Sequence, residues 1–348
     1  MRWDDIYVGG VAAFLGHKED VHEALADGRY DAEEHEENDY LFVRVEDELT
    51  PADMAVRAAR EALGRAGTPD GGVGLYLHAA STFQGLDHWT PGSYIQEQTA
   101  GGTAPALEVR QACNGAIMSL ELAAAYLTAK PEPSSALITT GDRYNPPAYD
   151  RYRTDKNILL ADGATALVLS RGREGVARLL STATVGDTGH EALGRGTGGW
   201  QQSPGDAGLP ILLRERKKEY LIGGGKIEDI IRTLTVRQQQ AMDTALSDAG
   251  VTAADVARFV YPNIGRVAQD WEIRKAAGIT EEQTTWAWGR EVGHIAAGDQ
   301  FAGLAHLLES GAVRPGDRVA LAGVGSGYNF GWAVVEILRT PQWSTTAS

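Results

Sequence analysis

The sequence predicts an α/β protein in which one chain carries two copies of the same structural unit. Three observations support this prediction: an internal repeat, helices that alternate with short apolar strands, and a length of 348 residues. A chain of 37.2 kDa with 43% hydrophobic residues can bury one large layered core or two fused domains of similar size.

The repeat starts with a matching helix in each half of the chain. Residues 54–67 have helical apolar spacing in the first half, and residues 237–250 match them in the second. Each segment ends on a glycine, which suits the C-cap of a helix. A short strand-like run follows each predicted helix, over residues 73–78 and 256–261.

The repeat continues with a second helix and two more strands in each half. We expect this helix over residues 113–127 in the first half and 294–308 in the second. The strands expected after these helices are 135–140, 164–170, 318–322 and 332–338. Because helices alternate with near-continuous apolar strands, we expect mostly parallel sheets with helices packed on them.

Two segments lie outside the repeat. The acidic residues 33–39 are expected to form a solvated face or a mobile surface segment. Residues 200–226 contain three consecutive glycines and a basic run from Arg214 to Lys218. We expect an irregular connection between the halves there, with solvated charges.

Composition excludes several classes of function. A net charge of -15 opposes nucleic-acid binding, and no run approaches the roughly 20 apolar residues of a membrane span. The first residues lack the features of a secretory signal, so we expect a cytoplasmic protein. The single cysteine, Cys113, excludes an intrachain disulfide and a cysteine-based zinc cluster. The histidines have no ligand spacing, so we expect no metal site.

The repeat makes Cys113 and His294 positional equivalents, each at the start of a predicted helix. The free amides and macrodipole of a helix N-terminus favour an anion, so a thiolate at Cys113 would be stabilised. A neighbouring imidazole would stabilise it further and could shuttle a proton. The alternative is that Cys113 is a buried core residue, as most single cysteines in helices are.

Four successive motifs resemble those of the ketoacyl-ACP synthase III family. They match the family in order and spacing over nearly the whole chain, and they are Ala112 to Ala116, Ala161 to Ala166, Gly293 to Asp299 and Gly323 to Gly327. The resemblance implies the five-layered αβαβα thiolase fold. It also implies an N-terminal half, residues 1–172, that carries the nucleophile, and a C-terminal half, residues 173–348, that carries the catalytic His and Asp.

The resemblance further implies a homodimer without a bound cofactor that takes an acyl group from coenzyme A or an acyl carrier protein onto Cys113. The amides of Cys113 and Gly327 would form the oxyanion hole, with Asn263 and Ser326 as supporting residues. Three arginines precede the strand after Asp162, where family members hold the nucleotide phosphates of coenzyme A. They are Arg143, Arg151 and Arg153. An exposed loop with unpaired arginines is the alternative.

The chain departs from the decarboxylating members of the family at two positions. Those members carry a proline-histidine pair where this chain has Pro262-Asn263, and an asparagine where it has His294. These two side chains stabilise the enolate that forms when a malonyl group loses carbon dioxide. We therefore expect transfer of the acyl group to a hydroxyl or amine of a small-molecule acceptor. Resemblance to the branches of the family that carry a Cys-His-Asp triad implies a natural-product acceptor, such as a sugar of an antibiotic glycoside. The alternatives are a starter-unit condensing enzyme and an inactive partner subunit.

Cys113, His294 and Asp299 together are the parts of an acyl-transfer triad. His294 would deprotonate the thiol and later the acceptor, and Asp299 would fix the tautomer of the imidazole. Residues five apart on an ideal helix point about 140° away from each other. Direct contact between His294 and Asp299 therefore requires His294 to lie on the turn before the helix.

Overall fold

The protein is described here by a computed structural model, which covers residues 1–67, 72–130, 134–203, 206, 208–269, 271–341 and 343. Within these residues a nine-stranded sheet has the order β5-β4-β6-β7-β1-β8-β11-β10-β9. The first limb of this sheet consists of β1 (Ile6–Leu15), β4 (Val73–Ala79), β5 (Ala106–Val109), β6 (Ser135–Asp142) and β7 (Gly163–Arg171). The second limb consists of β8 (Ala177–Gly186), β9 (Arg258–Val260), β10 (Arg318–Gly325) and β11 (Asn329–Ile337).

The strand order repeats between the two limbs. The series β4-β6-β7-β1 in the first limb matches β9-β10-β11-β8 in the second, with one parallel ladder followed by two antiparallel ladders. The internal duplication is therefore present in the topology. The domain boundary between residues 172 and 173 stays a prediction.

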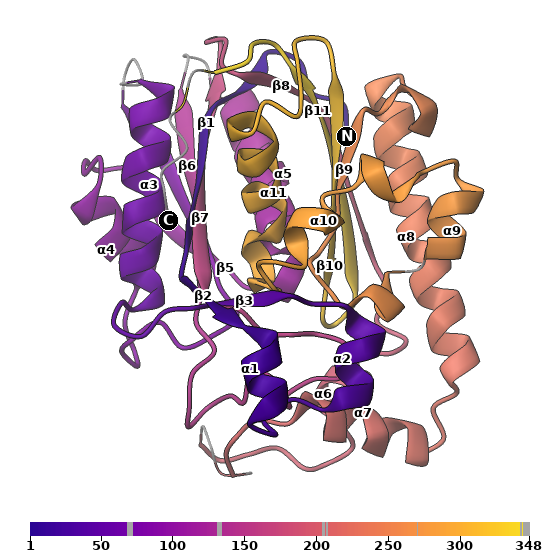
Figure 1. Cartoon of the computed structure of the whole chain (residues 1–348). Coiled ribbons are helices and arrows are strands. Elements are labelled where there is room, and N and C mark those ends of the chain that lie inside the picture. Colours follow the sequence, from indigo (N-terminus) through magenta and orange to yellow (C-terminus); the bar gives the residue numbers. More distant parts are fainter. Residues whose placement is uncertain are drawn as a thin grey trace.

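The two limbs enclose a central layer of helices. Only two residue pairs, Tyr7 with Arg178 and Val8 with Ala177, join β1 to β8, so the limbs can splay apart. In Figure 1 the helices α5 (Gly115–Thr128) and α11 (Asp299–Glu309) lie between them. The outer face of the first limb carries α3 (Pro51–Ala66) and α4 (Pro91–Gln98), and that of the second carries α8 (Ile227–Ala249). The predicted five-layered αβαβα arrangement is confirmed.

Side-chain alternation along the strands divides the core between these layers. On β6, Ile138 packs in the central cluster with α5 and α11, whereas Leu137 packs with α3 on the outer face. Ala320 of β10 packs with α8, and Leu321 faces the central helices. Both central helices are buried along most of their length, because one limb of the sheet covers them on each side.

The prediction of mostly parallel sheets is wrong. Among the described strands of the large sheet, five ladders are antiparallel and three are parallel. Residues 143–162 join β6 to β7 without a crossover helix, and a tight turn over residues 326–328 joins β10 to β11. Each chain segment therefore returns beside the strand that it has just left, which makes the pairing antiparallel.

The segments outside the repeat are more ordered than expected. The acidic stretch forms α2 (Ala32–Asn38), with Asp31 as its N-cap. The presumed irregular connection contains α7 (Leu213–Ile222), whose Arg214 forms a bidentate ion pair with Glu34. The expectation of an irregular connection with purely solvated charges is therefore wrong here, because opposite charges on α2 and α7 pair.

The remaining elements are short. They are β2 (His17–Asp20), α1 (Val21–Ala26), β3 (Phe42–Val45), α6 (Ala192–Arg195), α9 (Trp271–Ala276), α10 (Trp286–Gly289) and 3-10 turns at Ala112–Asn114, Ala253–Asp255, Arg266–Ala268, Glu281–Gln283 and Ala296–Gly298. In the part of the chain that the structure describes, no helix has the length and apolar character needed to cross a membrane.

Candidate active site

Cys113 lies in the 3-10 turn Ala112–Asn114 directly before α5. Its neighbour Ala112 has a φ of 45°, which is uncommon for a residue with a Cβ and is held here by the surrounding structure. The thiol is half-buried and packs against a small cluster formed by Tyr144, Leu160 and Ala296. The sharp turn thus places the sulfur directly before the N-terminus of α5, beside a cluster of buried apolar side chains.

His294 lies ahead of the second helix of the repeat, in extended backbone that bridges to Leu160. Its amide donates to the Leu159 carbonyl at 2.9 Å, and its carbonyl accepts from the Ala161 amide at 3.0 Å. Both sides of the His294 backbone are therefore fixed by the segment that precedes β7.

The predicted positional equivalence of Cys113 and His294 is wrong. The 3-10 turn of the second half is Ala296–Gly298, and its first residue, Ala296, has a φ of 52° that matches the value of 45° at Ala112. The structural counterpart of Cys113 is therefore Ala297. Apolar spacing fixes a helix only to within a turn, because a shift of three or four residues keeps the same face.

A line of hydrogen bonds joins the three predicted triad residues. His294 Nε2 lies 3.0 Å from Cys113 Sγ, and His294 Nδ1 lies 2.5 Å from Asp299 Oδ2. Asp299 is the first residue of α11, and His294 stands five residues before it on the preceding turn. This placement gives the contact that an ideal helix could not make. Both side chains are almost completely buried.

Asp299 also receives hydrogen bonds from the backbone around it. The Asn263 amide donates to Oδ2 at 2.7 Å, and the Ile295 amide donates to Oδ1 at 2.9 Å. The Asn263 side chain donates to Gly293 O at 3.1 Å and to Asp299 Oδ1 at 3.4 Å. Asn263 therefore supports the triad through Asp299. The sequence pointed to Asn263, but it carries no signal for the backbone amides.

The electrostatics of the site favour a charged imidazole. Burial alone lowers the pKa of His294, but the negative charges of Asp299 and Cys113 and their hydrogen bonds outweigh burial, so its pKa is raised well above the usual value. A protonated His294 can donate from Nε2 to Cys113 Sγ and from Nδ1 to Asp299 Oδ2 at the same time.

Asp142 is a second titratable residue near the site, and no sequence signal indicated it. Its Oδ1 accepts the amides of Ser81 and Thr82, both at 2.7 Å. Burial raises its pKa to about 6, against these hydrogen bonds and the nearby charge of His294. The carboxyl sits at the end of β6, two residues before Tyr144.

The glycine-rich segment lies close to the cysteine turn. A Cβ on Gly325 would be 2.2 Å from Gln111 O, so only glycine allows β10 to approach this turn. Gly327 follows in the turn between β10 and β11 with a φ of 93°, and Ser326 beside it is exposed. The oxyanion-hole roles of the Cys113 and Gly327 amides stay predictions, as does the supporting role of Ser326.

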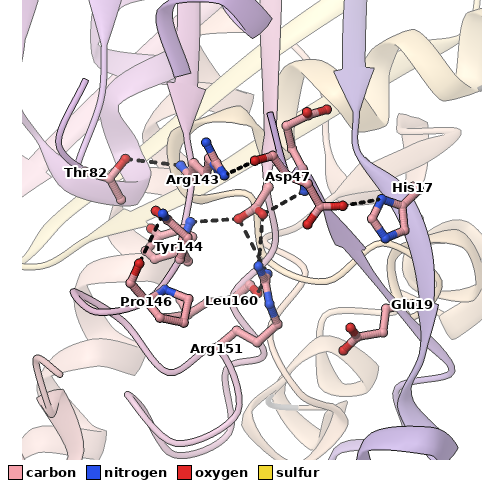
Figure 2. Close-up of polar contacts among 12 residues, drawn as sticks. His17, Glu19, Asp47, Thr82, Arg143, Tyr144, Pro146, Arg151 and Leu160 are labelled. Carbon is pink, nitrogen blue, oxygen red and sulfur yellow. Dashed lines mark hydrogen bonds and ion pairs between the residues drawn. The ribbon is translucent and has the colours of Figure 1, made fainter. Parts of the chain in front are cut away.

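The three arginines assigned to coenzyme A phosphates make contacts within the protein. Figure 2 shows Arg143 bonded to the backbone of Asp47, and Arg151 bonded to a carboxylate that also binds the Tyr144 amide. That carboxylate belongs to Asp162. Arg153 remains exposed and donates to Gly28 O. The coenzyme A role of these residues stays a prediction.

A metal site is not evident in the described residues. No group of three or more His, Cys, Asp or Glu side chains in them is arranged to hold a metal ion.

Two family models match the chain. Residues 107–188 match 3-oxoacyl-[acyl-carrier-protein (ACP)] synthase III, and residues 246–337 match the C-terminal part of the same enzyme. The first match contains the cysteine turn, and the second contains His294, Asp299 and the glycine-rich segment.

Similar proteins include both condensing enzymes and an acyltransferase. A β-ketoacyl-[acyl-carrier-protein] synthase III from Rhizorhabdus wittichii is 26% identical over 288 residues, which cover 82% of this chain and 84% of the relative. The acetoacetyl CoA synthase NphT7 from Streptomyces sp. (strain CL190) is 28% identical and covers 83% of this chain and 85% of its own. The solved structure of the acyltransferase ChlB3 is 33% identical with a TM-score of 0.90, and the match covers 98% of this chain and 100% of that chain.

Proposed function

This chain belongs to the ketoacyl-ACP synthase III-like family of the thiolase superfamily, and from that premise we propose that it transfers an acyl group to an oxygen or nitrogen nucleophile without decarboxylation. Family membership itself gives an enzyme of the acyl-transferring or condensing class. The choice between these two reactions depends on the side chains around Cys113.

The observation that carries the proposal is the hydrogen-bonded line Cys113–His294–Asp299. In the first half-reaction the Cys113 thiolate attacks the thioester carbonyl, and the leaving thiol takes the proton of the His294 imidazolium. In the second, neutral His294 accepts the proton of the acceptor hydroxyl or amine as that atom attacks the acyl-cysteine, and Cys113 leaves as a thiolate. Asp299 accepts the Nδ1–H bond and stabilises the imidazolium in both steps.

Decarboxylative condensation would need two neutral hydrogen-bond donors for an enolate. At one of the two positions that family resemblance indicates, Asn263 donates its amide to Gly293 O and Asp299 and supplies no imidazole. At the other, His294 is paired with Asp299 and carries a raised pKa. These contacts favour acyl transfer over carbon-carbon bond formation.

The natural substrates remain part of the proposal. The donor would be an acyl-CoA or acyl carrier protein, and the acceptor a small molecule such as the sugar of an antibiotic glycoside. Similarity to a protein described as an acyltransferase supports the reaction type. We further propose a homodimer in the cytoplasm.

Product analysis with a malonyl thioester labelled in its free carboxyl group tests the proposal. Acyl transfer predicts a labelled malonyl group on Cys113, followed by an intact malonyl ester or amide or by hydrolysis. Release of labelled carbon dioxide in step with formation of a β-ketone would instead support a condensing enzyme. The inactive-subunit alternative predicts no mass increase on Cys113 with any of a panel of acyl-CoA thioesters.

A further inference from the structure

A buried ion pair next to the triad is not used by the proposed chemistry. Asp162, directly before β7, is 0% exposed and accepts a hydrogen bond from Arg151 Nη2 at 3.0 Å on Oδ2. The same carboxylate accepts the Tyr144 amide at 2.7 Å and the Glu46 amide at 2.9 Å. A fully buried carboxylate with this many donors joins three separate chain segments at one point.

Arg151 connects this carboxylate to the segment that carries the His294 backbone. Its Nη1 donates to Leu160 O at 2.9 Å, and the Leu160 amide donates to Arg151 O at 3.2 Å. Leu160 is the residue that bridges to His294, whose amide and carbonyl bond to Leu159 and Ala161. One guanidinium therefore holds both Asp162 and the strand-like segment against which His294 is fixed.

A second connection runs through β3. The Asp162 amide donates to Arg44 O at 2.9 Å, and the Arg44 amide donates to Val292 O at 2.9 Å. Val292 stands two residues before His294. Two connections therefore join the backbone around His294 to the backbone around Asp162. One is the direct bonding of His294 to Leu159 and Ala161, and the other runs from Val292 through Arg44 of β3 to Asp162.

The Tyr144 contact extends the same arrangement to the apolar cluster beside Cys113. Tyr144 packs in the cluster that Cys113 contacts, and its amide is held by Asp162 (Figure 2). A displacement of Asp162 would therefore move the apolar wall beside the sulfur as well as the base. Misplacement of a reacting group by about 1 Å can cost roughly 100-fold in rate.

We infer that Arg151 and Asp162 form a positioning pair that holds His294 in register with Cys113, in place of a coenzyme A phosphate contact for Arg151. This inference rests on the proposed function only in taking His294 as the base. Arg151 suits the role because its planar fork binds the carboxylate and Leu160 O together, which a lysine ammonium does less well.

The rate of Cys113 alkylation by iodoacetamide tests the inference without an acyl donor or acceptor. At about pH 6.5 the reaction depends on a thiolate paired with His294, whereas at about pH 9.5 an unassisted thiol ionises as well. We expect Arg151→Gln to slow alkylation about 10-fold to 100-fold at the lower pH, with little change at the higher pH. Arg151→Lys should recover part of the loss. Titratable groups that interact with Cys113 and His294 include Asp142, Tyr144 and Asp299. Arg151 interacts with Glu19 and Tyr152, and none of these five groups is altered in the variants.

Arg65→Gln provides a matched control. Arg65 is also a buried arginine, and it donates to Val11 O and pairs with Glu61 and Glu309 away from the cysteine turn. We expect this variant to lower the melting temperature without changing the ratio of alkylation rates at the two pH values. An unchanged ratio in Arg151→Gln, or an equal change in Arg65→Gln, would overturn the inference.

A raised KM for acyl-CoA in Arg151→Gln with an unchanged alkylation ratio would also overturn it, in favour of phosphate binding. If Arg151→Gln does not fold, Arg151→Lys carries the same measurement with a smaller expected loss. Should the wild-type enzyme transfer no acyl group to an oxygen or nitrogen acceptor, the proposed function fails, but the alkylation ratio still decides the positioning role.

Discussion

The Asp299 carboxylate accepts hydrogen bonds from His294, the Asn263 amide and the Ile295 amide. A carboxylate bound by two backbone amides has one orientation, and it therefore gives the imidazole one orientation and one tautomer. At the residue scale, the proposed chemistry depends on this fixed geometry as much as on the identities of the three side chains.

His294→Ala should reduce turnover by about 10²-fold to 10⁴-fold, because both half-reactions lose their general acid and base. Asp299→Asn should preserve donor binding and impair turnover. An asparagine has one acceptor oxygen, so its NH2 group would face an N–H donor at the position of Oδ1 or of Oδ2, and the negative charge that stabilises the imidazolium would be lost. Single-turnover rates of acyl-enzyme formation and discharge check both variants, with thermal unfolding as the control for folding. Wild-type rates in Asp299→Asn would remove Asp299 from the triad.

Asp142 predicts a pH dependence of stability. Burial raises its pKa in the folded protein to about 6 from 3.8, so the neutral form fits the fold better than the charged form. The contribution of the neutral Asp142 carboxyl to the free energy of unfolding is complete below pH 3.8, and it is lost as the pH rises through about 6. Between about pH 5 and pH 8, wild type should lose about 1 kcal/mol of unfolding free energy relative to Asp142→Asn. Urea unfolding at both pH values measures this difference, and an equal difference at the two values contradicts it.

At this scale the sequence singled out Cys113, His294 and Asp299 by residue type and motif spacing, and the structure places them in hydrogen-bond contact. Their catalytic roles stay predictions. The sequence did not identify Asp142, which stands at the end of an otherwise uninformative buried strand. The sequence also did not predict the ion pair between Arg151 and Asp162. This pair depends on how the 20-residue connection over residues 143–162 folds.

At the element scale, the approach of β10 to the cysteine turn depends on glycine. Gly325 lies where a Cβ would be 2.2 Å from Gln111 O, a backbone atom that cannot move independently. Gly325→Ala should therefore displace the turn that carries Cys113, slow its acylation and cost about 1–3 kcal/mol of stability. Intact mass after timed exposure to an acyl-CoA, together with urea unfolding, measures both effects.

Gly64→Ala is the control for this substitution. Gly64 lies within α3, with no atom within 4 Å of the position of an added Cβ. Alanine there should stabilise the helix by about 0.5–1 kcal/mol and leave acylation unchanged. Gly325→Ala with wild-type stability and acylation would show that the close approach has no role.

Apolar spacing located the repeated helices and strands but not their starts or directions. The helix expected to begin at Cys113 begins at Gly115, and the one expected at His294 begins at Asp299. Intervening 3-10 turns with a positive φ at Ala112 and Ala296 account for the difference, and alanine gives no signal for such a conformation. The sequence also did not predict which strands pair antiparallel. A continuous apolar run shows that a strand is buried on both faces, but it does not show the direction of the neighbouring strand.

At the scale of the whole molecule, the first limb of the sheet ends in an exposed strand. β5 stands at the end of the strand order, and Leu107 within it is 51% exposed. Phe83 and Leu86, in the loop after β4, are 57% and 64% exposed. An edge strand beside large exposed apolar side chains is a surface that proteins usually cover.

This edge supports the proposed homodimer, and because β5 belongs to the N-terminal half we predict a symmetric contact through that half. In a two-fold dimer the same patch meets itself, so one substitution alters the interface twice. Sedimentation at micromolar concentration should give about twice 37.2 kDa for wild type, and Leu107→Asp should shift the protein toward 37.2 kDa by placing a charge on each side of the contact. Ile222→Asp is the control, because Ile222 on α7 is equally apolar and 77% exposed but belongs to the other half. A fully active wild-type monomer would contradict the dimer itself. Dissociation caused by Ile222→Asp and not by Leu107→Asp would show that the dimer contact lies elsewhere.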